Sequence, residues 1–422
     1  MPQTIQLLPG VTLRCAPAQH FKQGCLSLQF LRPMCREEAA VNALIPSVLL
    51  RGTVKRPDLR ELTLHLDDLY GASVGELVRR IGDYQTVGLI SGFIDDRFAL
   101  SGDRILEPMI DFLRELLLEP VMDGEGFSRE FVAGEKRNLI ATIEAQRNDK
   151  RAYTAAQMLK KMCAADSFGI PRLGEPEQVA AIDPVFAYRH YRRILEQSPV
   201  EIFYVGSADP ETVAKYLMRI FEQIPRSPIT LPGHTPFCDR GGGGDFTETM
   251  DVAQGKLSMG YVTPITNREK HFAPMQVFNV IFGSGMTSKL FMNVREKQSL
   301  CYSIGSGYYG SKGIVTVSAG IDCAMESRVR DEIGRQLDAC RNAQITAEEL
   351  TAAKEAVLSG LSSVYDAPGA IEAYESTAAI GQLAVTLEEY RQAVEAVTAE
   401  QVAQAAQTLR LHTTYFLKGV ER

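Results

Sequence analysis

The chain has 422 residues, 45% hydrophobic and 23% charged, which is typical of a soluble globular protein and long enough for two or more domains. Its net charge of −7, without any long lysine or arginine cluster, argues against a nucleic-acid partner. No apolar run approaches the roughly 18 residues of a membrane span, and the N-terminus lacks the pattern of a targeting signal. The eight cysteines form no CxxC pair, which predicts a reduced, cytoplasmic protein without membrane contact; a disulfide framework is the minority alternative.

The first half of the chain alternates short apolar runs with amphipathic helical patterns. Strands are predicted at residues 12–15, 25–30, 73–81, 84–94 and 199–206, and helices at 37–51, 58–70, 106–118, 127–162, 183–197 and 209–224. Pro46 falls inside the first helix and is expected to bend it. Together these elements predict an N-terminal domain over residues 1–225.

The composition changes after that domain. Several prolines and a run of four glycines predict a linker at residues 226–245, so the C-terminal domain covers residues 246–422. In that domain, strands are predicted within 247–263 and at 313–321 and 412–417, and helices at 273–282, 325–343, 347–364, 387–397 and 399–409.

The two halves resemble each other weakly. Residues 135–149 (EKRNLIATIEAQRND) and 353–366 (AKEAVLSGLSSVYD) are both helical patterns that end near an aspartate. Each is followed by a helix-rich stretch and then by a late strand, VEIFYVG in one half and TTYFLKG in the other. This arrangement predicts a duplicated domain of about 200 residues.

Residues 283–303 (GSGMTSKLFMNVREKQSLCYS) hold the most specific pattern in the chain. A glycine turn is followed by Ser288 as a helix cap, a short helix with one apolar stripe, and an alternating strand. Arg295 and Tyr302 stand seven positions apart at the junction of helix and strand. From the residues alone, Arg295 on a solvated helix face and Tyr302 in the core is the simpler interpretation.

Familiar catalytic motifs are missing from the sequence. None of the six histidines forms the i, i+4 pair of a helical zinc peptidase, although a zinc site assembled from distant histidines stays open as an alternative. There is also no GxSxG in a strand–turn–helix context, no P-loop and no dinucleotide-binding glycine fingerprint.

The segment SKLFMNVREKQSLCYS resembles a signature in the second half of the pitrilysin/insulinase family of zinc metallopeptidases. The stretches QGKL at 254–257, PRLGEPEQVAAI at 171–182 and TAEELTAAK at 346–354 also resemble family segments, so the likeness covers nearly the whole chain. The resemblance implies an α+β fold made of two duplicated α/β domains, each a mostly antiparallel sheet covered by helices.

The zinc site of that family is not preserved here. The family places His-x-x-Glu-His ahead of a Gly-Thr pair, which Gly52 and Thr53 match, and adds a glutamate ligand after a Glu-basic pair. The aligned ligand and base positions hold Ala43, Pro46, Ser47 and Thr142. Alanine and proline cannot bind zinc, and hydroxyls are poor substitutes, so we expect this chain to bind no metal or other cofactor of its own.

The chain keeps the family's arginine and tyrosine, Arg295 and Tyr302, but lacks the zinc ligands. In this it resembles the non-catalytic subunit of two-subunit family members similar to mitochondrial processing peptidase and its bacterial relatives. By that resemblance, Arg295 and Tyr302 are substrate-binding residues that act in the zinc site of a partner subunit. The implied partners are a zinc-bearing family paralogue and a peptide substrate, and a homodimer stays possible. The alternatives are a scaffold protein that keeps the fold without supporting hydrolysis, and a standalone peptidase with an unusual metal site.

Overall fold

A computed structural model describes residues 2–241 and 243–419 of the chain. Residue 242 of the predicted linker, and residues 1 and 420–422 at the ends of the predicted domains, lie outside the described residues. The described chain forms two compact units. Unit 1 comprises residues up to 144, 170–233 and 364–380, and unit 2 comprises 145–169, 234–363 and 381–419. Each unit therefore contains a segment from the other half of the sequence.

Unit 1 is built on a six-stranded sheet with the order β1-β2-β8-β3-β5-β4. Its strands are β1 (Gln3–Leu8), β2 (Val11–Pro17), β3 (Gln23–Pro33), β4 (Ser73–Ile81), β5 (Tyr84–Ile94) and β8 (Val200–Gly206). β2 and β8 run parallel, and every other neighbouring pair is antiparallel. β4 is an edge strand of this sheet, and it carries part of the site described below.

Unit 2 contains a five-stranded sheet with the order β11-β12-β10-β13-β9. Its strands are β9 (Gly244–Met250), β10 (Gly255–Val262), β11 (Ser303–Tyr309), β12 (Ile314–Ile321) and β13 (Arg410–Gly419). β9 and β13 run parallel and the other pairs are antiparallel. This is the order and orientation of β4-β5-β3-β8-β2 in unit 1, which agrees with the predicted fold of two duplicated, mostly antiparallel domains.

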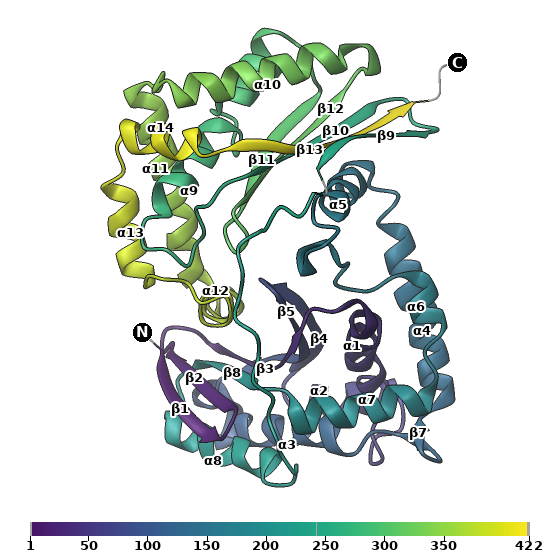
Figure 1. Cartoon of the computed structure of the whole chain (residues 1–422). Coiled ribbons are helices and arrows are strands. Elements are labelled where there is room, and N and C mark those ends of the chain that lie inside the picture. Colours follow the sequence, from purple (N-terminus) through teal and green to yellow (C-terminus); the bar gives the residue numbers. More distant parts are fainter. Residues whose placement is uncertain (1, 242, 420–422) are drawn as a thin grey trace. The chain divides into compact units, whose positions relative to one another are not determined.

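Helices cover both sheets (Figure 1). In unit 1 they are α1 (Arg36–Leu49), α2 (Leu59–Asp68), α3 (Leu106–Leu118), α4 (Arg129–Ala145), α6 (Pro176–Ala180), α7 (Pro184–Gln197), α8 (Pro210–Phe221) and α12 (Pro368–Ile380). In unit 2 they are α5 (Lys150–Met162), α9 (Ala273–Phe282), α10 (Glu326–Arg341), α11 (Ala347–Ser362), α13 (Leu387–Glu395) and α14 (Ala399–Gln407). None of the helices in the described ranges is long and apolar enough to cross a membrane.

Short elements complete the two units. β6 (Met122–Asp123) pairs with β7 (Gly126–Phe127) outside the two large sheets. Single turns of 3₁₀-helix are η1 (Asp96–Phe98), η2 (Leu100–Gly102), η3 (Ser167–Gly169), η5 (Cys323–Met325) and η6 (Ser363–Asp366). The described residues from 225 to 241 form no helix or strand, and β9 begins at Gly244, inside the predicted linker.

The long helix predicted at residues 127–162 is two helices, α4 and α5. The chain leaves the helical conformation after Ala145, and the Asp149 side chain accepts hydrogen bonds from the first backbone N–H groups of α5 at 3.0 Å. An aspartate in this position begins a new helix because it satisfies N–H groups that have no partner within the helix. The break is where the chain passes from unit 1 to unit 2.

The helices α5 and α12 occupy equivalent places in the two units. α5 lies against β10 and β13 of unit 2, and α12 lies against β3 and β8 of unit 1, the matching strands. α5 approaches closely because Gly260 of β10 has no side chain: a Cβ there would lie 2.7 Å from the sulfur of Met158. α12 is fixed instead by Glu372, a fully buried carboxylate that forms an ion pair with Arg79 at 2.9 Å.

Candidate functional site

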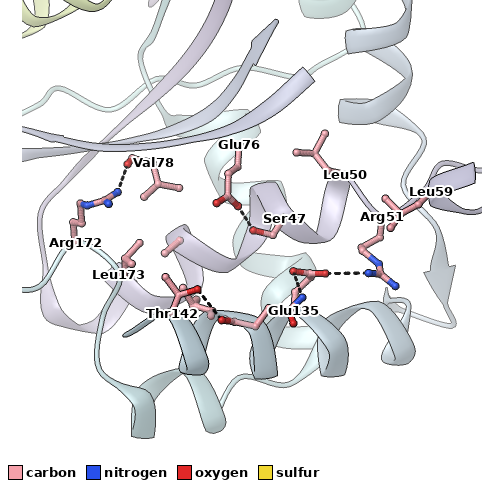
Figure 2. Close-up of a pocket in the computed structure, with 13 residues that line it drawn as sticks. Ser47, Leu50, Arg51, Leu59, Glu76, Val78, Glu135, Thr142, Arg172 and Leu173 are labelled. Atoms are coloured by element: carbon pink, nitrogen blue, oxygen red, sulfur yellow. Dashed lines mark hydrogen bonds and ion pairs between the residues drawn. The ribbon is translucent and has the colours of Figure 1, made fainter. Parts of the chain in front are cut away.

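The positions that replace the family's zinc ligands and base lie on two helices of unit 1. Ala43, Pro46 and Ser47 belong to α1, and Thr142 belongs to α4. Ala43, Ser47 and Thr142 line one pocket of about 420 Å³ between α1, α4 and β4, whereas Pro46 is buried within α1 and does not line it (Figure 2). α1 continues past Pro46 to Leu49. The structure thus gathers three of the four predicted positions around one pocket.

These side chains do not form a donor set that fits zinc. Ala43 offers only a methyl group, the Ser47 hydroxyl donates to Glu76, and the Thr142 hydroxyl donates to the Asn138 carbonyl oxygen at 2.9 Å. Across residues 2–241 and 243–419, no three histidine, cysteine, aspartate or glutamate side chains gather closely enough to hold a metal ion. Because zinc sites use at least three nitrogen, sulfur or carboxylate ligands, the pocket does not fit a zinc ion.

The pocket lining includes a charged pair. The Glu135 carboxylate is mostly buried and lies 3.4 Å from Nη1 of Arg51, and it also accepts a hydrogen bond of 3.1 Å from Asn138. On the opposite side, exposed Arg172 donates from Nη1 to the Val78 carbonyl oxygen of β4 at 2.7 Å. Figure 2 shows both interactions at the border of the pocket.

A buried polar network supports the pocket behind Ala43. The neighbouring residue Asn42 donates to Gln85 at 2.9 Å, and its amide oxygen lies 2.7 Å from Nε2 of His190. Gln85 in turn donates to the carbonyl oxygen of Arg172 at 2.6 Å. Burial lowers the pKa of His190 to about 4, so the ring is neutral at pH 7. The network joins α1, β5 and α7 to the segment that carries Arg172.

The segment at residues 283–303 lies in unit 2 and has the predicted glycine turn, helix and strand. The helix is η4 (Leu290–Lys297), which has the wider π-helical winding, and the strand is β11. The N-cap residue of this helix is Lys289 and not the predicted Ser288, which lies one position earlier and accepts a hydrogen bond from the Phe291 N–H at 3.3 Å. The ammonium of Lys289 is bound by Glu349 of α11 at 2.8 Å, which fixes the start of η4.

On unit 2, Tyr302 is exposed and Arg295 is partly exposed. The Arg295 side chain is 41% exposed, its guanidinium lies 4.7 Å from the centre of the Phe291 ring, and it pairs loosely with Glu296 at 3.7 Å. Tyr302 is 63% exposed, and within the described residues its hydroxyl has no hydrogen-bond partner. The interpretation of Tyr302 as a core residue is therefore wrong, whereas Arg295 does lie on a solvated face. The substrate-binding role of the pair stays a prediction.

Two charged residues of the pocket, Glu76 and Arg172, were not expected from the sequence. Glu76 stands in a strand pattern between Gly75 and Leu77, where an outward-facing glutamate is ordinary. Arg172 stands in a loop more than ninety positions away in the sequence. Nothing in the local pattern predicts that both reach the same pocket, because the register of β4 and the path of the loop decide it.

A family model described as the peptidase M16 inactive domain matches residues 187–357. A probable inactive metalloprotease of Bacillus subtilis, YmfF, is 29% identical over 98% of this chain and 96% of its own length.

Two solved structures share the fold over the full length of the chain. A conserved protein from Enterococcus faecalis has a TM-score of 0.92 at 27% identity, covering 100% of this chain and 99% of its own. The peptidase M16 inactive domain from Pseudomonas fluorescens has a TM-score of 0.80 at 16% identity, covering 100% of this chain and 98% of its own. These comparisons confirm the predicted resemblance to the pitrilysin/insulinase, or M16, metallopeptidases.

Proposed function

We propose that this inactive, M16-family peptidase-like chain is the non-catalytic subunit of a heterodimeric zinc endopeptidase. In this proposal the zinc site belongs to a partner subunit, a zinc-bearing paralogue, and this chain contributes Arg295 and Tyr302 to the binding of a peptide substrate. Arg295 holds a carbonyl or the C-terminal group of the substrate, and the Tyr302 hydroxyl donates to the oxyanion of the transition state.

One observation carries the proposal. Tyr302 presents a hydroxyl that has no partner in the described chain, on a side chain that is 63% exposed. An exposed tyrosine whose hydroxyl is unused can form a hydrogen bond to a group outside its own chain without breaking one inside it. The pocket of unit 1 supports the same conclusion, since its donors do not fit the metal that hydrolysis in this family requires.

The proposal includes a cytoplasmic location. The eight free cysteines support it, because disulfides are rare in the cytoplasm.

A second candidate function is a scaffold that binds a partner without contributing to hydrolysis. Arg295 favours it, because the aromatic face of Phe291 and the neighbouring Glu296 already provide its guanidinium with partners. A homodimer is compatible with either function.

The peptidase activity of a complex of the chain with a zinc-bearing family member distinguishes the two candidate functions. We expect Tyr302→Phe to reduce kcat/KM of the complex by about 100-fold, the order of effect for losing one oxyanion donor, and Arg295→Ala to reduce it as well. Lys297→Ala is the matched control, since Lys297 is exposed on the same helix and, among the described residues, its ammonium bonds only to Asn293.

Size-exclusion chromatography shows whether each variant still forms the complex. If the complex forms and its peptidase activity is unchanged in both variants, the proposed contribution of Arg295 and Tyr302 is wrong and the scaffold function stands. If all three variants lose activity equally, the segment acts through its packing and not through the two side chains.

A further inference from the structure

The two hydroxyl groups in the pocket of unit 1 have spent their hydrogen-bond donors inside the protein. The Ser47 hydroxyl donates to Glu76, and the Thr142 hydroxyl donates to the Asn138 carbonyl oxygen. A hydroxyl has one proton and two lone pairs, so the oxygens of Ser47 and Thr142 can still accept hydrogen bonds but have no proton for a ligand. The neutral part of the lining is therefore suited to a ligand that donates.

Glu76 adds a negative charge without a cationic partner. Its carboxylate is exposed on β4 and points toward Ser47 across the pocket (Figure 2). Among the described residues it forms no ion pair, whereas the other carboxylate of the lining, Glu135, is neutralised by Arg51. Ser47 occupies one oxygen of the Glu76 carboxylate and leaves the second one available to a ligand.

Apolar side chains complete the wall of the pocket. They are Leu50 directly after α1, Leu59 of α2, Leu139 of α4, Val78 of β4 and Leu173 in the loop before α6. These groups can cover an aliphatic chain of several methylenes, which loses contact with water as it lies against them.

Arg172 is the cation that opposes this interpretation. Its guanidinium has no carboxylate partner in the part of the chain that the structure describes, although it is held on the Val78 carbonyl oxygen at 2.7 Å. An anionic ligand would use Arg172, and a cationic ligand would be repelled by it. The charge of the ligand can therefore be decided by changing Glu76 and Arg172 separately.

We propose that the pocket binds an alkylammonium group, with the ammonium at Glu76 and Ser47 and the aliphatic stem against the leucine-rich wall. A primary ammonium has three N–H donors and no acceptor, which complements the free acceptor positions on Glu76 and Ser47. The group can be the lysine side chain of a peptide segment or a free polyamine. This inference goes beyond the proposed function and does not depend on Arg295 or Tyr302.

Isothermal titration calorimetry of the full chain tests the proposal with three probes. These are acetyl-Gly-Lys-Gly-amide, the same peptide with norleucine in place of lysine, and cadaverine. We expect the lysine peptide or cadaverine to bind in about the millimolar range, as fits one exposed carboxylate, and the norleucine peptide to bind about tenfold more weakly. Binding by the peptide alone identifies a lysine side chain as the source, and binding by cadaverine alone identifies a free amine.

Single substitutions show whether the amine binds in this pocket. Glu76→Gln should weaken amine binding about tenfold and Arg172→Gln should strengthen it, while Glu125→Gln, an exposed glutamate of the same unit outside the lining, should have no effect. Circular dichroism confirms that each variant is folded. The proposal is overturned if the norleucine peptide binds as well as the lysine peptide, if no amine binds at about 10 mM, or if Arg172→Gln abolishes binding.

Discussion

The pocket of unit 1 and the segment at residues 283–303 of unit 2 differ in whether their hydroxyl groups are hydrogen-bonded within the protein or left free for an outside partner. In the pocket, Ser47 and Thr142 turn their hydroxyl protons to groups of their own unit. In the other segment, Tyr302 leaves its hydroxyl to solvent. The backbone of unit 1 still gathers the aligned positions around one pocket, so what sets this chain apart from a zinc peptidase is side-chain chemistry and not the fold.

The largest expected effect comes from introducing zinc-ligand side chains into the pocket by substitution. The combined variant Ala43→His, Ser47→His and Thr142→Glu places two imidazoles one turn apart on α1 and a carboxylate on α4. We expect it to bind zinc in a one-to-one ratio, measured by elemental analysis after dialysis. Ala43→His alone is the control and should bind none stoichiometrically. A folded triple variant without zinc would show that the framework differs as well as the side chains.

The next effect concerns the buried polar network behind the pocket. His190 has a pKa near 4 in the folded protein because burial disfavours the charged ring, and about 6.5 when unfolded. The unfolded chain therefore binds the extra proton first as the pH falls. Protonation of His190 does not reduce the free energy of unfolding above pH 6.5. As the pH falls from 6.5 to 4, it reduces that free energy by roughly 3 kcal/mol.

Urea unfolding followed at several pH values measures that decline. His190→Gln provides the control, because glutamine can donate to Asn42 but does not titrate, so the part of the pH dependence due to His190 should disappear. An equally steep decline in this variant would mean that other groups cause the acid sensitivity.

A smaller effect is expected at the start of η4. Lys289 is buried and its ammonium is bound by the partly exposed Glu349, so Lys289→Met should destabilise unit 2 by about 2 kcal/mol, less than for a fully buried pair. Lys297→Ala, on the exposed face of the same helix, should change stability by less than about 0.5 kcal/mol. Denaturant unfolding of both variants measures the difference. Equal losses would show that the pair with Glu349 does not anchor the segment.

Much of the fold could be predicted from the sequence because local signals agreed with the final packing. The helix and strand around Arg295 follow from an apolar stripe, a serine near the helix start and an alternating run, and the structure has them as η4 and β11. The family resemblance added the mostly antiparallel sheets, which no local pattern could supply.

The exchange of helices between the two units could not be predicted. Residues 127–162 have a helical pattern throughout, and the break before Asp149 matters only because α5 packs on β10 and β13. In the same way, Glu76 is an ordinary strand glutamate in the sequence, and it becomes part of a pocket through its hydrogen bond with Ser47. Both features depend on contacts between residues that are distant in the sequence, which local patterns do not contain.

Under the proposed function, this chain supports hydrolysis only through the zinc of another subunit. The most direct measurement is the zinc content and peptidase activity of the purified chain, alone and mixed with a zinc-bearing family member. We expect no stoichiometric zinc and no activity in the chain alone, and activity in the mixture above that of the partner by itself. Stoichiometric zinc together with peptidase activity in the chain alone would contradict the proposed function.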